Sequence, residues 1–269
     1  MKHFFLFLLT TFSTMCMSQP LSNMISENDS AIVECQYKLS FRKDKHDSPN
    51  FYSTDTVIVH ISKHSSHSFC VRENELSMNL HERFLKTGKR WTNFNNWYGY
   101  IGDVYNDYDR VTQHVRILMD AAGVYGYEEQ IPTMSWKVAS DRKKRILGYE
   151  CINATCSFRG RKYDAWFCPS LPFKCGPWKF GGLPGLIMEI FDASEDYIFT
   201  CVCINKKSRD SYNIDDSYIV KSSRKKMLQM QKMLCKKPGT FCEGYNVRIN
   251  VGGMSGDILG FDCNQIELK

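Results

Sequence analysis

Residues 168–191 read CPSLPFKCGPWKFGGLPGLIMEIF, and the architecture of the protein can be predicted outward from them. Positions 169–185 hold four prolines and four glycines, so we expect neither a helix nor a regular strand ladder there. The large apolar residues within this loop are Trp178, Phe180 and Leu183. Such a composition is typical of a packed loop. Residues 186–191 follow directly and are apolar on both faces except for Glu189, so they predict a central strand of a sheet.

Further strands are predicted on both sides of this stretch, because short runs alternate between apolar and polar residues or are rich in β-branched side chains. These strands cover residues 31–39, 56–61, 145–152, 163–167, 197–204 and 245–251. The strand at 197–204 follows the one at 186–191 after a short polar loop, which indicates a hairpin. Consecutive strands joined by short loops favour antiparallel pairing.

Two segments, residues 71–88 and 222–236, have the periodicity of helices. Their apolar stripes are Leu76, Leu80 and Phe84 in the first segment and Met227, Met230 and Leu234 in the second. The second segment begins with serines that can cap it, and Pro238 and Gly239 follow its end. We therefore expect an α+β protein, mainly antiparallel β, with a curved sheet or half-barrel and one or two packed helices.

Composition excludes several classes of protein. The chain has 269 residues, of which 43% are hydrophobic, too many for a disordered chain. Its net charge of +6 comes from 35 basic and 29 acidic residues spread widely, unlike the basic stripe of a nucleic-acid-binding protein. After residue 18 no apolar run approaches the ~20 residues of a membrane-spanning helix. We expect a single domain over residues 19–269, with no cofactor and no nucleic acid as partner.

The first eighteen residues predict a secretory signal peptide. Lys2 begins a short basic region, residues 4–9 are unbroken apolar residues, and Ser18 supplies a small residue before Gln19. Cleavage near Ser18 would deliver the protein to the periplasm or the exterior. Lipidation of Cys16 is an alternative, but the preceding residues lack the usual leucine and small residue of a lipoprotein signal.

Cysteine usage agrees with export. The chain has 12 cysteines, and eleven remain without Cys16, which is common in an oxidising compartment. An odd number leaves at least one thiol outside intramolecular disulfides. Cys168 and Cys175 are close enough in sequence to close a short loop, as are Cys235 and Cys242. These are candidate disulfides, although the connectivity cannot be derived from sequence.

The central stretch resembles the GLPGLI family, which is named for a six-residue motif. The matching motif residues are Gly182, Leu183, Pro184, Gly185, Leu186 and Ile187, preceded by Gly176 and Pro177. The segments RILGYEC (145–151), FRGR (158–161) and YDAWF (163–167) follow the family's usual order, and the resemblance is most specific over residues 130–205. It implies a structural role for the motif and a secreted envelope protein of Bacteroidota, often encoded beside TonB-dependent outer-membrane receptors. No activity and no catalytic residue follow from it.

Three histidines form a candidate metal site. His60, His64 and His67, followed by Cys70, have spacings that would place them on one face of a helix, and such ligands suit zinc or copper. The local sequence instead resembles a strand that leads into a serine-rich loop. The alternative interpretation is therefore a solvated polar turn with Cys70 in a disulfide.

A second candidate site lies in the basic segment near residue 160. Arg161 and its basic neighbours could hold an anionic ligand against the aromatic residues Tyr163, Trp166 and Trp178. The alternative is a strand edge whose charges keep it soluble. The basic helix at 222–236 could likewise bind an acidic surface, but such helices more often pack their apolar stripe on a sheet and leave their lysines in water.

The sequence contains no phosphate loop, dinucleotide motif, metalloprotease motif or nucleophile elbow. Asp103, Asp107 and Asp109 could form a carboxylate cluster, or simply a turn-rich loop. The leading hypothesis is therefore a non-enzymatic accessory protein that binds a small ligand or an envelope partner, such as an outer-membrane receptor, in an apolar, aromatic-lined concavity. A hydrolase acting on peptide or glycan through the acidic loop is the second hypothesis. A metal or redox accessory protein is the third.

Overall fold

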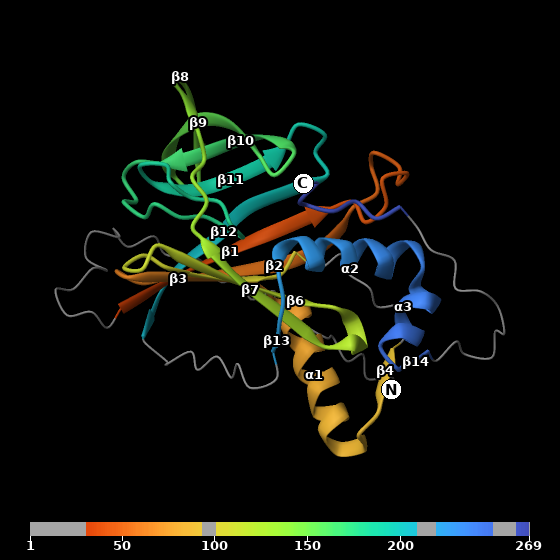
Figure 1. Ribbon diagram of the computed structural model, residues 1–269. Coiled ribbons are helices and arrows are strands. Elements are labelled where there is room, and N and C mark those ends of the chain that lie inside the picture. The colour runs from red at the N-terminus through yellow and green to blue at the C-terminus, as the bar shows by residue number, and fades with distance from the viewer. Residues whose placement is uncertain (1–30, 93–100, 209–218, 250–261, 269) are drawn as a thin grey trace, which may run out of the picture.

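The computed structural model describes residues 31–92, 101–208, 219–249 and 262–268. Within these ranges twelve strands form one open sheet, and Figure 1 shows their arrangement. In spatial order the strands are β13 (Val220–Lys221), β7 (Val124–Gln130), β6 (Thr112–Leu118), β5 (Asp103–Asp107), β3 (Ser65–Cys70), β2 (Ser53–Ile61), β1 (Ala31–Phe41), β12 (Tyr197–Ser208), β11 (Leu186–Asp192), β10 (Arg161–Cys168), β9 (Tyr149–Phe158) and β8 (Lys137–Ile146). All neighbours pair antiparallel except β13 and β7.

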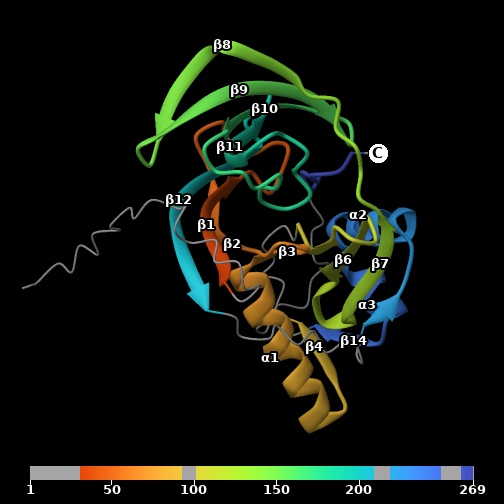
Figure 2. The same cartoon turned by 90° about the vertical axis from the view of Figure 1, so that its left-hand side faces the viewer.

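The sheet is strongly curved, and the loop between β10 and β11 lies inside the curve (Figure 2). Trp178, Phe180 and Leu183 of this loop are almost fully buried. The backbone N–H of Trp178 donates to Ser68 Oγ (2.8 Å), and its indole N–H donates to the carbonyl of Ile101 (3.0 Å). The expectation of a packed proline- and glycine-rich loop is confirmed. Because the loop fills the concave side, the expected apolar concavity for a ligand is occupied by the chain itself.

In the part of the chain that the structure describes, three α-helices accompany the sheet. They are α1 (Val71–Thr87), α2 (Arg224–Lys236) and α3 (Pro238–Gly244), and a 3₁₀ turn, η3 (Asp120–Ala122), lies between β6 and β7. Helix α2 buries the predicted stripe, and Ser223 caps it by accepting a hydrogen bond from the N–H of Lys226. Helix α2 ends at Lys236, so Pro238 follows its end as expected, and Pro238 also begins α3. Its ring fixes φ and its missing N–H is harmless in the first turn of a helix.

The strands predicted at 56–61, 163–167, 186–191 and 197–204 are confirmed, and β11 is central, between β10 and β12. The prediction of one strand over 145–152 is wrong. The chain turns back at Leu147 and Gly148, which have φ of 51° and 83°. Two successive residues with positive φ make the tight turn that matches the twist of antiparallel strands, so this segment is the tip of the β8–β9 hairpin.

The strand expected at 245–251 is shorter than predicted in the part that the structure describes. Strand β14 (Val247–Ile249) pairs in parallel with β4 (Arg90–Thr92) in a separate two-stranded sheet. The expected signal peptide, Cys16 and Ser18 lie outside the described residues. Among the helices of the described ranges, none combines the length and apolar composition needed to cross a bilayer.

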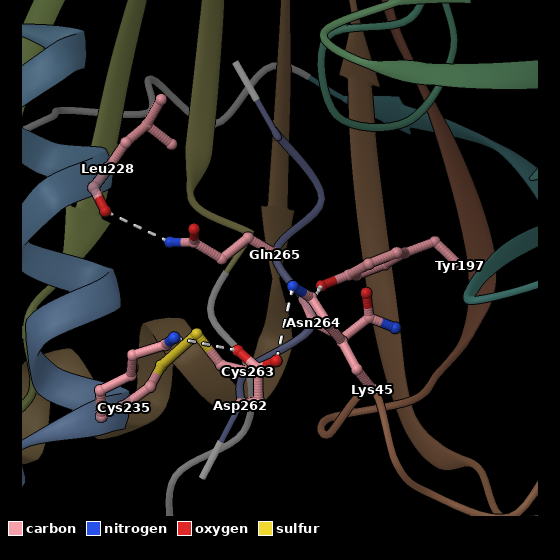
Figure 3. Close-up of a disulfide and its surroundings, with 9 residues drawn as sticks. Lys45, Tyr197, Leu228, Cys235, Asp262, Cys263, Asn264 and Gln265 are labelled. Carbon is pink, nitrogen blue, oxygen red and sulfur yellow. Dashed lines mark hydrogen bonds and ion pairs between the residues drawn. A yellow bond between two sulfur atoms is a disulfide. The ribbon is translucent and has the colours of Figure 1, made fainter. Parts of the chain in front are cut away.

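One disulfide links Cys235 of α2 to Cys263, 28 residues later, with a Cα–Cα distance of 5.8 Å (Figure 3). The expected pairing of Cys235 with Cys242 is therefore wrong, because Cys235 bonds to the C-terminal segment. Cys168 and Cys175 are not bonded to each other either. Cys175 is buried, and its thiol accepts a hydrogen bond from the hydroxyl of Tyr108.

Candidate functional site

The residues predicted to bind an anion are placed in two different environments. Arg161 is buried and donates to Asp192 (2.9 Å), Asp196 (2.8 Å) and the carbonyl of Gln265 (2.6 Å). Its guanidinium is thus occupied by the chain's own acceptors. The arginine holds the C-terminal segment against β10, which is a structural role.

The three aromatic residues of that set do not converge. Tyr163 is buried, and its hydroxyl donates to the carbonyl of Ile266 (3.4 Å). Trp178 lies in the core, whereas Trp166 points to the opposite face of β10, because successive strand residues alternate. There Lys144 Nζ lies 4.5 Å from the Trp166 ring centroid.

The three histidines of the predicted metal site contact three different carboxylates. His60 Nε2 lies 3.0 Å from Glu34, His64 Nδ1 lies 2.9 Å from Asp109, and His67 Nε2 lies 2.5 Å from Asp103. Over the described ranges no group of three histidine, cysteine or acidic side chains could hold a metal ion. The histidines therefore belong to a hydrogen-bonded network instead of a common ligand set.

A row of polar side chains crosses six strands on the sheet face opposite the core. Strand register places its members directly opposite one another, in the order Glu34, His60, His67, Tyr105, His114 and Glu128. His60 and His67 are buried although they lie on this face. The next pair on the same face of β5 and β6, after Tyr105 and His114, is Asp103 and Arg116. This pair lies near the β3–α1 junction.

A pocket opens at the β3–α1 junction, beside this row. It is lined by Phe69, Cys70, Glu73, Asn74, Ser77, Asp103, Arg116, Leu118 and Val124. It has room for about three water molecules. Phe69 supplies an aromatic wall, while two carboxyl groups and a guanidinium supply hydrogen-bonding groups. We refer to this hollow as the Glu73 pocket.

Asp103 is the ionised carboxyl group of the pocket. Burial alone would raise its pKa, but the charges and hydrogen bonds of His67 and Arg116 outweigh burial and lower it. One oxygen of Asp103 contacts His67, and the other accepts from the Arg116 guanidinium. Both oxygens are thus engaged, and the carboxylate fixes the positions of its two partners.

Glu73 is the second carboxyl group, and it lies in the first turn of α1. Burial raises its pKa to about 8, although the backbone N–H groups of Leu118 and Gly102, at 3.3 and 3.2 Å, favour the carboxylate. At neutral pH the group is therefore mainly protonated. A protonated and an ionised carboxyl group side by side are the arrangement that provides an acid and a base in many active sites.

Sequence reasoning missed Glu73 and Arg116 and included Asp103 only as part of an acidic loop. The structure separates Asp103, which lines the pocket, from the rest of that loop. Asp107 closes the β5–β6 turn by accepting hydrogen bonds from the backbone N–H groups of Asp109 and Arg110. Two signals could have led to Glu73: it is an acidic residue in a helical first turn, and it lies six residues after His67.

A second cavity lies under α2 and has room for about one water molecule. Lys179, Glu267, Arg224 and Tyr127 line its polar side. The C-terminal segment contributes to its lining, and Figure 3 shows Gln265 of this segment donating to the carbonyl of Leu228 (3.3 Å) near the disulfide. The charged residues of this cavity bind one another, as in a structural ion-pair network.

Comparison with known proteins shows kinship only for a short segment. Residues 157–189 match a family described as "Protein of unknown function (Porph_ging)". This match spans β10, the packed loop and the start of β11. The sequence matches no curated protein.

Among solved structures, the fold is similar to that of PNGF-II in space groups P21 and C2. The TM-scores are 0.52 and 0.51, with 14% sequence identity in both cases. The match covers 75% of this chain but only 33% and 32% of PNGF-II. The chain thus corresponds to about a third of that protein's length, and the similarity establishes the fold alone.

Proposed function

We propose that the chain is an exported protein of the cell envelope, with residues 1–18 as a cleaved signal peptide. The basic, apolar and small-residue segments of these residues support export. The Cys235–Cys263 disulfide is also typical of an oxidising compartment. The resemblance to GLPGLI proteins supports an envelope location and an accessory role, for which a TonB-dependent outer-membrane receptor is one candidate partner.

The test of export is the N-terminus of the mature protein, isolated from a periplasmic or secreted fraction. We expect it to begin at Gln19. A lipidated N-terminus at Cys16 would show that the protein is exported as a membrane-anchored lipoprotein and is not cleaved after Ser18. A chain recovered from the cytoplasm with Met1 intact would contradict the proposal.

We propose further that the protein binds a small polar ligand in the Glu73 pocket. The observation that carries this proposal is the set of groups that line the pocket: the Phe69 ring, the Glu73 and Asp103 carboxyl groups and the Arg116 guanidinium. Ligand sites commonly combine an apolar wall with a few fixed polar groups. Here His67 and Arg116 hold Asp103, so the polar groups are fixed before any ligand arrives.

The charges of the pocket favour a neutral ligand. Arg116 is compensated by Asp103, and Glu73 is mainly protonated at neutral pH because its pKa is about 8. A neutral group with several hydrogen-bond donors and acceptors, such as a sugar hydroxyl or a peptide amide, matches such a lining. The size of the pocket indicates that it takes the end of a ligand rather than a whole one.

The experiment uses saturation-transfer NMR with two neutral probes, glucose and N-acetylglycine methylamide. Ser77 lines the pocket, so Ser77→Trp fills it, while Asn79→Trp places the same ring on the exposed side of α1. We expect one probe to bind the wild type and Asn79→Trp equally, and at least ten times more weakly to Ser77→Trp. Equal signals for both variants and the wild type would contradict the proposal.

A hydrolase acting on peptide or glycan is the second candidate, and the contrasting protonation of Glu73 and Asp103 favours it. Because both oxygens of Asp103 are engaged, we place it second to binding. Its test is the release of nitrophenol from a panel of nitrophenyl glycosides and of nitroaniline from a panel of peptide nitroanilides. Turnover by the wild type that falls at least 100-fold in Glu73→Gln would establish the enzyme; no release would leave binding as the function.

A further inference from the structure

Cys151 and Cys168 face each other on the neighbouring strands β9 and β10. The ladder between these strands pairs Ile152 with Phe167, and the two cysteines are the next residues in the same register. Opposite residues of antiparallel strands have Cα atoms ~4.5–5.5 Å apart, inside the ~4.4–6.8 Å range of disulfides. The two thiols are hydrogen-bonded to each other, so little movement would be needed to join them.

The surroundings of the pair favour the thiolate of Cys168. Hydrogen bonds from the Cys151 thiol and from Ser170, whose hydroxyl lies 3.0 Å from the Cys168 sulfur, lower the pKa of Cys168 in spite of burial. The same contact raises the pKa of Cys151. Cys168 is thus the thiol that favours the thiolate and would act first in an exchange, and Cys151 would act second.

We propose that Cys151 and Cys168 form a disulfide in the exported protein by thiol–disulfide exchange with a small disulfide, of which oxidised glutathione is the test case. The Cys168 thiolate attacks one sulfur of the small disulfide, and one small thiolate leaves. Cys151 then loses its proton to solvent and attacks the Cys168 sulfur, and the second small thiolate leaves. Two protein thiols are oxidised, and one small disulfide is reduced to two thiols.

This bond has a defined structural effect. Cys168 is the last residue of β10, directly before the packed loop, and its carbonyl oxygen lies where a side chain at Gly185 would begin. Linking Cys168 to β9 would fix both the start of the loop and the point at which the loop returns to β11. It would also explain why Cys168 does not pair with Cys175.

Oxidation is best followed by peptide mapping. The mature protein is incubated with or without oxidised glutathione, and its remaining thiols are then alkylated with iodoacetamide in denaturant before digestion without reductant. We expect a peptide that contains Cys151 to be linked to one that contains Cys168, and this link to disappear with dithiothreitol. Carbamidomethylated Cys151 and Cys168 after incubation, or a bond from Cys168 to Cys175, would overturn the proposal.

Variants give an independent readout. Cys151→Ser, Cys168→Ser and the double variant should lower the melting temperature of the oxidised protein by the same amount, because each removes one and the same bond. Cys156→Ser is the matched control, since Cys156 is also buried on β9 but lies farther along the strand. Its effect should be the same with and without dithiothreitol. Additive losses for the two single variants would contradict the bond.

Discussion

Lys179 and Glu267 form an ion pair in the interior, where their side chains are only 1% and 6% exposed. Lys179 belongs to the packed loop, and Glu267 belongs to the C-terminal segment. Burial lowers the pKa of Lys179, and the charges of Glu267 and Glu129 partly offset this effect. The pair therefore ties the packed loop to the end of the chain, together with Arg161 and the Cys235–Cys263 bond.

Removing the charge at position 179 should destabilise the protein. In Lys179→Met, Glu267 keeps only its contacts with Arg224 and Arg159, and removal of one partner of a buried pair costs about 3 kcal/mol. The midpoint of urea unfolding measures this loss. Lys174→Met is the control, because Lys174 lies in the same loop but is exposed. Equal midpoints for the two variants would show that the ion pair contributes nothing.

The disulfide of the C-terminal segment should stabilise the protein through its loop of 28 residues. A loop of that length corresponds to about 3–4 kcal/mol in the chain-entropy account. We expect Cys263→Ser to lose this amount under oxidising conditions, measured by urea unfolding. In dithiothreitol the wild type and the variant should unfold at the same midpoint. A difference that persists in reductant would mean that Cys263 stabilises the protein by packing instead of by its bond.

Much of the fold could be predicted from the sequence, because its signals are local. Period-two alternation marks β11 and β12, and the prolines and glycines of residues 169–185 mark the packed loop. The β8–β9 turn is not predicted, because leucine rarely adopts the positive φ that Leu147 has in this turn, whereas glycine and asparagine often do. Local patterns thus identify elements better than the turns between them.

The candidate site could not be predicted in the same way, because its contacts join distant residues. His67 and Asp103 lie 36 residues apart and meet only through the β3–β5 register. The sequence predicts a ligand-binding role for Arg161 because its actual partner, Gln265, lies 104 residues later and local patterns do not reveal it. A basic side chain beside aromatic residues is equally consistent with a buried structural arginine, and only the tertiary fold separates the two roles.

Gly185 should not tolerate a side chain. A Cβ atom at this position would lie 2.2 Å from the carbonyl oxygen of Cys168, so the loop would have to move away from β10. We expect Gly185→Ala, and more strongly Gly185→Val, to lower the free energy of unfolding by roughly 2 kcal/mol or more. Gly239→Ala in α3 is the control, since nothing lies within 4 Å of its added carbon. An unchanged unfolding midpoint in Gly185→Ala would contradict the close approach.

Glu73 should make the stability of the protein fall as the pH rises. The pKa of its carboxyl group is about 8 in the folded protein and ordinary, near 4.5, in the unfolded chain. Between these values the folded protein holds a proton that the unfolded chain has lost, so each added pH unit lowers the free energy of unfolding by at most about 1.4 kcal/mol. The effect is absent below the lower pKa and complete above the higher one.

Glutamine cannot lose a proton, so Glu73→Gln should not show this fall. The free energy of unfolding of Glu73→Gln minus that of the wild type should rise from pH 5 to pH 8 and stay constant above pH 9. Met78→Gln introduces the same residue on the exposed side of α1 without removing a titratable group, so its difference from the wild type should not depend on pH. If the Glu73→Gln difference is equally flat, the carboxyl group is ionised in the fold, and the neutral pocket inferred from its protonation is wrong.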